Sequence, residues 1–259
     1  MSCPFDELKR IMSKLRSPSG CPWDREQTHQ SLKPYLLEEA YEVLEALDSG
    51  SDTEIAEELG DLLLQVIFHA QIASEQERFD IEAVIRNLND KLIRRHPHVF
   101  GNAVIKNADQ QKKHWEKIKR QEGKTSVLDG VPVSLPALIR AVRLQQKAST
   151  VGFDWNSMEP VLDKISEELD ELRAACEAGD PDRMTEELGD FLFSLANASR
   201  FLHIDPEDAL RRTCQKFTDR FHFIEERLKK EGKPINQASL EEMDAIWEDA
   251  KKKGQKSRN

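Results

Sequence analysis

The amino-acid sequence predicts an all-α protein that consists of two tandem repeated helical-bundle domains. Two observations lead to this prediction. Apolar residues recur with the 3.6-residue period of amphipathic helices through almost the whole chain of 259 residues, and the alternation that is typical of strands is nearly absent. The sequence also repeats itself, because a shift of 129 residues places 38–61 on 167–190 without a gap.

The apolar period predicts two successive sets of helices. Their ends carry residue types that are common there: Gly50 and Gly179 follow the ends of expected helices, and Pro181 lies in an expected first turn. The first set is expected at 4–16, 31–48, 52–76, 80–95 and 107–121, and the second at 135–148, 158–178, 181–203, 205–231 and 239–253.

The segment between the two sets has the composition of a connector. Residues 122–136 contain two glycines and two prolines, which are residue types that interrupt helices. We therefore expect an N-terminal domain over 1–121, a linker over 122–136 and a C-terminal domain over 137–259.

Composition and charge exclude several classes of protein. The longest apolar stretch, Leu62–Ala73, contains polar residues and is too short to span a bilayer, and the first ten residues lack the apolar region of a signal peptide. A net charge of −10 argues against binding to a nucleic-acid polymer. The four cysteines form no CxxC pair, which suits reduced thiols. We expect a cytoplasmic protein without a membrane span.

The residues that the two copies share are mainly charged. The identical pairs include Glu38/Glu167, Glu39/Glu168, Glu42/Glu171, Gly50/Gly179, Glu57/Glu186 and the run 58–61/187–190. A shift of 125 aligns Lys91 and Arg95 with Lys216 and Arg220, and a shift of 132 aligns Trp115 and Lys119 with Trp247 and Lys251. The three segments keep their order, so the chain is predicted to be a tandem duplication.

The shared carboxylates have the spacing of a cation site. Glu39 and Glu42 are three residues apart and lie near one helix face, and Glu58 and Asp61 repeat this spacing on the next helix. The short connection makes these helices antiparallel neighbours. Four carboxylates brought together raise one another's pKa, and a divalent cation would relieve their repulsion. Oxygen ligands without His or Cys suit Mg²⁺, or Mn²⁺. The equivalent residues in the second copy are Glu168, Glu171, Glu187 and Asp190.

A solvated acidic face is the alternative for any single copy of this motif. Two facts favour a cation site. The carboxylates recur as a set while the positions between them differ, and the apolar run that follows Asp61 predicts a helix deep in the core, where acidic residues need a partner.

The basic pairs suit the phosphates that Mg²⁺ commonly carries in proteins. Lys91 with Arg95, and Lys216 with Arg220, are each spaced for one helix face. The tryptophans that follow could stack on a base, with a lysine one turn further on. The alternatives are a surface role for the basic pairs and a core role for Trp115 and Trp247.

Several further motifs accompany these residues. They are GCPWD (20–24), LEEAYE (37–42), ELGDLL (58–63), RRHPHVF (94–100), LDGVP (128–132), LPAL (135–138) and VGFDW (151–155). Together with the ExxE…ExxD pattern on paired helices, they resemble the all-α nucleoside triphosphate pyrophosphohydrolase superfamily. Nearly the whole chain resembles its tandem-domain MazG branch.

This resemblance implies an enzyme that hydrolyses nucleoside triphosphates to monophosphate and pyrophosphate with Mg²⁺. It further implies broad nucleotide specificity, a role in house-cleaning or stress-linked control of the nucleotide pool, and a homodimer. The implied metal ligands, one of them the water-activating base, are Glu168, Glu171, Glu187 and Asp190, with Lys216, Arg220, Trp247 and Lys251 binding the nucleotide. Their N-terminal counterparts are Glu39, Glu42, Glu58, Asp61, Lys91, Arg95, Trp115 and Lys119. The resemblance favours turnover in the C-terminal copy, although neither copy has lost a motif residue.

Competing interpretations have weaker support. The tripeptide at 123–125 resembles the end of a P-loop, but Ile118 stands where the first glycine would be. A di-iron bundle would need Glu-x-x-His on two helices, and only Glu26 with His29 fits, in a stretch that reads as a loop. His96 and His98 are expected to have a structural role in a loop. The main non-enzyme alternative is a helical sensor or scaffold that binds metal and nucleotide without turnover.

Overall fold

The computed structural model describes residues 3–103, 107, 110 and 126–256, with side chains described as far as Lys253. All regular secondary structure within these residues is helical, which confirms the predicted fold class. The expected helix over 107–121 falls mostly outside the described residues, and so do Trp115 and Lys119.

The chain divides into two compact units, residues 1–107 and 108–259. Each unit contains one copy of the repeated carboxylate motif. The domain end that we expected at residue 121 lies in a part of the chain that is not described, so that boundary stays a prediction. The described linker residues, 126–136, form turns and extended segments without a helix.

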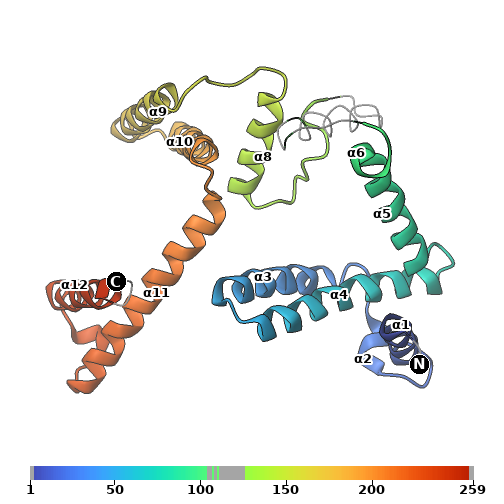
Figure 1. Ribbon diagram of the computed structural model, residues 1–259. Helices are drawn as coiled ribbons and strands as arrows, with labels where there is room; N and C mark the ends of the chain where they lie inside the picture. The colour runs from blue at the N-terminus through green and yellow to red at the C-terminus, as the bar shows by residue number, and fades with distance from the viewer. Residues whose placement is uncertain (1–2, 104–106, 108–109, 111–125, 257–259) are drawn as a thin grey trace. The chain divides into compact units, whose positions relative to one another are not determined.

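The first unit is built around a pair of antiparallel helices. Its elements are α1 (Pro4–Leu15), α2 (Pro22–Glu26), α3 (Lys33–Ser49), α4 (Asp52–Glu75), α5 (Ile81–Arg95) and α6 (Pro97–Phe100). Helices α3 and α4 lie side by side, and α1 packs against α4 (Figure 1). Helix α5 follows α4 after a short turn and contacts both α4 and α6.

The core of this unit forms where α1 meets the second half of α4. Met12, Leu32, Ile67 and Phe68 are buried in one apolar cluster. Arg16, at the end of α1, lies over the ring of Phe68 and forms an ion pair of 2.7 Å with a glutamate of α4. This contact joins the ends of the two helices beside the cluster.

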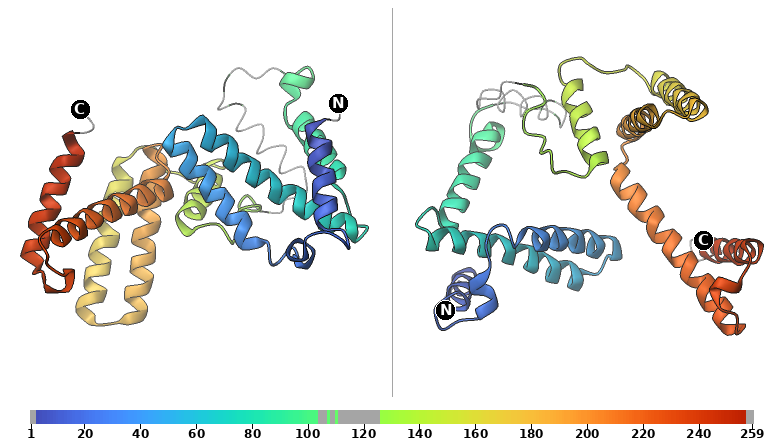
Figure 2. Two further views of the ribbon diagram at one scale, coloured as in Figure 1. Left: turned by 90° about the horizontal axis from the view of Figure 1, so that it is seen from below. Right: turned by 180° about the vertical axis from the view of Figure 1, so that it is seen from behind.

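The second unit contains an antiparallel helix pair equivalent to that of the first unit. A second pair of helices follows it along the chain. Its elements are α8 (Ala137–Ser149), α9 (Glu159–Ala178), α10 (Pro181–Phe201), α11 (Pro206–Lys230), the 3₁₀ helix η1 (Ile235–Gln237) and α12 (Leu240–Lys256). Helices α9 and α10 lie antiparallel and in contact (Figure 2), and α8 packs against α10. Helix α11 contacts α12 and α8.

The turn that connects the two helices has the same structure in both pairs. Gly50 and Gly179 end the first helix of each pair with φ of 72° and 66°, a left-handed conformation that side chains with a Cβ rarely adopt. The next helix begins at once, because the side chains of Ser51 and Asp180 accept hydrogen bonds from its first backbone amides. The predicted boundaries of these four helices are therefore confirmed to within two residues.

Three short elements were not predicted. They are α2, α6 and η1, which have at most five residues each and are too short to show an apolar period. As a result, the prediction of a loop at Glu26 was wrong, because this residue ends α2.

The expectation that the apolar run around Asp61 places α4 deep in the core is confirmed for only part of the helix. The helix buries Ile67 and Phe68, but Leu59, Leu63 and Val66 are 40–50% exposed. Helix α10 shows the same pattern, with Leu188 and Leu192 exposed. Side chains of α1 cover the second half of α4, where Ile67 and Phe68 lie, and α3 runs beside α4. None of the described helices is both long enough and apolar enough to cross a membrane.

Candidate metal and nucleotide site

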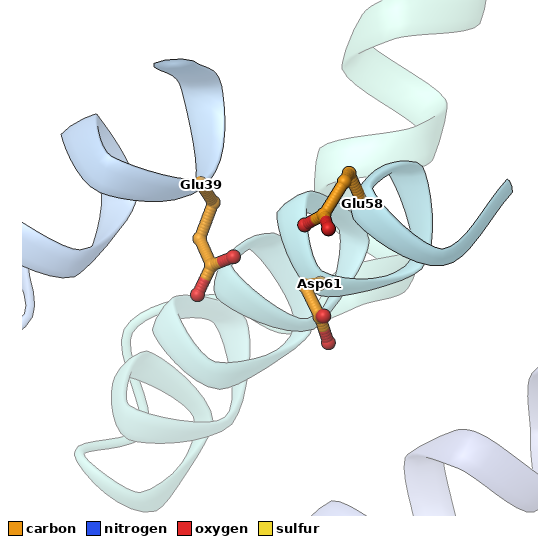
Figure 3. A group of neighbouring side chains, drawn as sticks. All are labelled: Glu39, Glu58 and Asp61. Carbon is orange, nitrogen blue, oxygen red and sulfur yellow. The ribbon is translucent and has the colours of Figure 1, made fainter. Parts of the chain in front are cut away.

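The N-terminal carboxylates meet across the α3–α4 pair. Glu39 reaches from α3 toward Glu58 and Asp61 on α4 (Figure 3), and one oxygen from each of the three lies within 4.8 Å of the others. Glu42, the fourth predicted ligand, is not in this closest group. The predicted approach of the two acidic faces is thus observed, with three of the four residues in contact range of one ion.

Desolvation and mutual repulsion act on this group. Desolvation, followed by the charge of Asp61, raises the pKa of Glu39, while a hydrogen bond of 3.3 Å from the amide of Gln65 opposes the shift. Desolvation also raises the pKa of Glu58, and the charges of Glu42 and Asp61 add to it. A cation bound between the carboxylates would relieve the repulsion.

The C-terminal carboxylates meet in the same way across α9 and α10. Glu168, Glu171 and Glu187 each place one oxygen within 4.8 Å of the other two. Desolvation, followed by the charges of Glu187 and Glu168, raises the pKa of Glu171. Asp190 lies outside this closest group and lines a cavity next to it, together with Glu168.

Lys164 is a site residue that the sequence reasoning missed. Its Nζ lies 2.7 Å from Oε1 of Glu168 and 2.8 Å from Glu167, and these hydrogen bonds raise the pKa of the lysine. Glu168 is 5% exposed, and its Oε2 is buried without a hydrogen-bond partner in the described part of the chain. The i,i+4 spacing could have revealed the pair. The repeat has Tyr35 at this position, so the lysine distinguishes the C-terminal copy.

Of the C-terminal basic residues, Arg220 lies next to Trp247. The guanidinium of Arg220 lies 5.3 Å from the centre of the tryptophan ring, and Phe217 packs on the same ring at 5.2 Å. Lys251 is paired with Glu248 one turn earlier on α12, and Lys216 is exposed on α11. Among the described residues, no hydrogen bond or ion pair joins this cluster to the carboxylates of α9 and α10. The carboxylates and the basic residues of the predicted site therefore form two separate groups in the described part of the chain.

The N-terminal basic residues are only partly described. Lys91 is exposed and Arg95 is half-buried in the last turns of α5. Their predicted neighbours, Trp115 and Lys119, lie outside the described residues. A nucleotide-binding role for this group stays a prediction.

The histidines of the competing interpretations have structural neighbours. Nδ1 of His29 lies 2.8 Å from Nδ1 of His69, and the two rings are stacked. Nδ1 of His96 lies 2.7 Å from the carbonyl oxygen of Leu92 at the end of α5, which agrees with a structural role. His98 lies in α6 and not in a loop, which corrects that part of the expectation.

Each copy of the repeat matches a known protein family. The model of the MazG nucleotide pyrophosphohydrolase domain matches twice, over residues 27–100 and 156–222. The chain belongs to the MazG family. Each match contains one set of the four carboxylates and one basic pair, whereas Trp247 and Lys251 lie beyond the second match. The tandem organisation and the family resemblance are confirmed.

Relatives of similar length carry names that describe an activity. The chain is 54% identical to the nucleoside triphosphate pyrophosphohydrolase/pyrophosphatase MazG of Thermotoga maritima, over 95% of both proteins. It is 42% identical to the nucleoside triphosphate pyrophosphohydrolase of Escherichia coli K12, over 96% of this chain and 97% of that protein. It is also 46% identical to the uncharacterized protein YabN of Bacillus subtilis, over 98% of this chain but 53% of that protein. The names of the first two relatives agree with the prediction of an enzyme of this class.

Proposed function

We propose that the chain is a Mg²⁺-dependent pyrophosphohydrolase, which converts nucleoside triphosphates with different bases to monophosphates and pyrophosphate. The observation that carries this proposal is the group of three carboxylates within 4.8 Å of one another on facing helices of each family domain. The names of the relatives support the reaction, and the shared basic pairs support a phosphorylated substrate. Its role would be house-cleaning or stress-linked control of the nucleotide pool.

The carboxylates fit Mg²⁺, and also Mn²⁺. The ligand atoms are all oxygen, the pKa values of Glu39, Glu58 and Glu171 are raised by desolvation and mutual repulsion, and Glu168 keeps a buried oxygen without a partner. A bound Mg²⁺ would neutralise the triphosphate and polarise its α-phosphorus.

The protein side chains would position the substrate and move one proton. The carboxylates of α9 and α10 would hold the ion, and one of them would accept a proton from the attacking water. Lys216 and Arg220 neutralise the phosphates, and Trp247 orients the guanidinium of Arg220. Lys251 would complete the nucleotide pocket, and no covalent intermediate is required.

Two features favour turnover in the C-terminal copy. Glu168 is more buried than its counterpart Glu39 and is held by Lys164, which the N-terminal copy lacks. A cavity opens beside the carboxylates of this copy. We infer that the N-terminal site binds metal and contributes less to the reaction.

Analysis of the products tests the reaction. The protein is incubated with a nucleoside triphosphate and Mg²⁺, and the products are separated by ion-exchange chromatography. Monophosphate with pyrophosphate is the expected result. Diphosphate with phosphate would contradict the bond that we propose to be cleaved, and binding without turnover would favour a nucleotide sensor or scaffold.

Matched substitutions test which copy turns over. Glu171→Gln is expected to lower kcat on the order of 10²-fold or more, because it removes a charge from the catalytic group. Glu42→Gln changes the equivalent residue of the other copy and is expected to cause a smaller loss. A larger loss from Glu42→Gln would show that the N-terminal copy is the active one.

We also propose a homodimer in a reducing, cytoplasmic setting. Exposed apolar side chains on α4, α5 and α10 leave faces for a second copy to cover, which supports the dimer. All four cysteines are free, which supports the reducing setting.

A further inference from the structure

We propose that the cavity beside the C-terminal carboxylates takes the base of the nucleotide, and that Asn197 sets the preference among the bases that the site accepts by donating a hydrogen bond to the edge of the base. This inference rests on the proposed function. The cavity has a volume of about 690 Å³ and lies within the second unit, between α8, α10, the start of α9 and the segment before it. That volume is in the range of sites for small molecules.

The position of the cavity connects it to the carboxylates. Glu168 belongs both to the group of three carboxylates and to the cavity wall, and Asp190 and Lys164 line the same wall. A triphosphate bound at the carboxylates would therefore have its nucleoside end at the mouth of the cavity. The far wall is unsuited to phosphate because its side chains are mainly apolar.

The apolar wall provides flat surfaces. Trp155 and Phe193 line the cavity and remain 43% and 45% exposed, and Phe153 stands beside them. Aromatic rings that face water in a cavity offer a surface for stacking, and a base has an apolar face that matches them. Leu128 and Leu144 complete this side.

Two polar atoms of the wall have no partner in the described part of the chain. Asn197 is 3% exposed, and its Oδ1 accepts hydrogen bonds of 3.0 and 2.9 Å from Arg200. Because a guanidinium only donates, the oxygen must face it, and the amide hydrogens of Asn197 stay available. Gln145 donates to the carbonyl of Phe193, which leaves its buried Oε1 as a free acceptor.

An ion pair holds Arg200 in place, and Arg200 in turn fixes the orientation of the Asn197 side chain. Arg200 forms an ion pair with Asp154 through Nη1 at 2.8 Å and a second bond through Nη2. Asp154 belongs to the segment that carries Phe153 and Trp155, so one network positions both the aromatic wall and the amide. A donor and an acceptor in a cavity with stacking surfaces match the edge of a nucleobase, where acceptors and N–H donors lie side by side.

The N-terminal copy lacks this arrangement. The shift of 129 residues that superimposes the carboxylates places Phe68 at the position of Asn197 and Gln71 at that of Arg200. Phe68 is 3% exposed and packs in the apolar core with Met12 and Ile67. Base selection is therefore a property of the C-terminal copy.

Binding measurements on the full chain test the location of the base. Hydrolysis-resistant α,β-methylene analogues of ATP and GTP are titrated with Mg²⁺, and tripolyphosphate serves as the ligand without a base. Trp155→Ala is expected to weaken both analogues about tenfold through the lost stacking, with tripolyphosphate unchanged. Trp155→Phe, which keeps a ring, should restore most of the affinity. The control is Trp23→Ala, which removes an exposed tryptophan of the other unit and should change the affinity for neither analogue.

Asn197→Asp tests the selection itself. This variant keeps the shape and the acceptor for Arg200, but replaces the two amide donors by a carboxylate oxygen. The affinity ratio of the GTP to the ATP analogue is expected to fall about tenfold, because the new acceptor repels a base carbonyl and attracts a base amino group. Thermal unfolding checks that the variant is folded.

The outcomes separate this inference from the proposed function. Hydrolysis in the wild type, with a base ratio that Asn197→Asp leaves unchanged or raises, overturns the inference and leaves the proposed function intact. The same holds if Trp155→Ala weakens self-association while the affinity for both analogues is unchanged, because a second copy would then fill the cavity. Absence of both hydrolysis and triphosphate binding overturns the two together.

Discussion

At the scale of single residues, desolvation and mutual repulsion disfavour the ionised form of the carboxylate groups. The pKa values of Glu39, Glu58 and Glu171 are raised above the ordinary value of 4.5. A raised pKa means that the folded state binds protons more readily than the unfolded state. The metal-free protein therefore carries a stability cost above the raised values, and this cost is relieved as the pH falls through them toward 4.5.

This linkage predicts a pH-dependent effect of Mg²⁺ on stability. Mg²⁺ needs the ionised carboxylates, so it should raise the unfolding temperature above the raised pKa values and lose its effect as the pH approaches 4.5. At saturating Mg²⁺ near neutral pH the expected gain is about 2–8 °C. Scanning calorimetry with and without Mg²⁺ at two pH values measures it. An equal gain at both values would contradict ionised carboxylates as the ligands.

Lys164 is a positive charge within the protein that pairs with Glu168. Its side chain is 35% exposed, whereas that of Glu168 is 6% exposed. Lys164→Met should lower the free energy of unfolding by about 1–2 kcal/mol, less than for a fully buried pair, because the lysine is partly solvated. Urea unfolding without Mg²⁺ measures the loss. Lys229→Met, an exposed lysine of α11, is the control, and an equal loss there would mean that the pair with Glu168 adds nothing.

At the scale of the elements, glycines in α9 and α10 predict opposite effects of the same substitution. Gly179 ends α9 with φ of 66°, so Gly179→Ala should cost about 1 kcal/mol of stability. Gly189 lies within α10, and a Cβ there would meet no atom within 4 Å. Gly189→Ala should therefore stabilise the protein by about 0.5–1 kcal/mol.

Chemical unfolding of the two variants measures both values. The pair serves as its own control, because each substitution adds one methyl group to the same unit. A loss of stability from Gly189→Ala would show that another surface packs closely against this turn of α10. The second copy in a dimer would be such a surface.

At the scale of the whole molecule, the exposed apolar faces predict self-association. Leu88 and Leu92 lie one turn apart on α5 and are 44% and 43% exposed. Light scattering on the purified chain should report twice the mass of one chain, since contiguous apolar surface of this kind is commonly covered by a partner. The double substitution Leu88→Asp with Leu92→Asp should shift the protein toward the monomer.

Asn89→Asp adds a charge to the same helix and is the matched control, which should leave the dimer intact. The substituted leucines are exposed within one chain, so the fold of the unit should survive. A monomeric wild type would refute the dimer. A dimer that persists in the double variant would place the interface away from α5.

The sequence by itself determined the helices, the repeated turn and the approach of the carboxylates. Each of these depends on residues that are close along the chain. The spacing of Glu39 with Glu42, and of Glu58 with Asp61, sets one helix face, and the Gly50 turn brings the two faces together. The family resemblance rests on the same local motifs.

Only the tertiary structure decided which side chains share a cavity and which polar atoms stay unpaired. Trp155 and Asn197 are 42 positions apart in the sequence, and Arg220 meets Trp247 across two helices. The exposed leucines of α4 likewise follow from the packing of α1, and not from the apolar period. Helical spacing is a local property of the chain, whereas contacts between distant segments depend on how whole helices pack. The repeat therefore revealed two equivalent carboxylate groups, and the packing around α10 revealed how they differ.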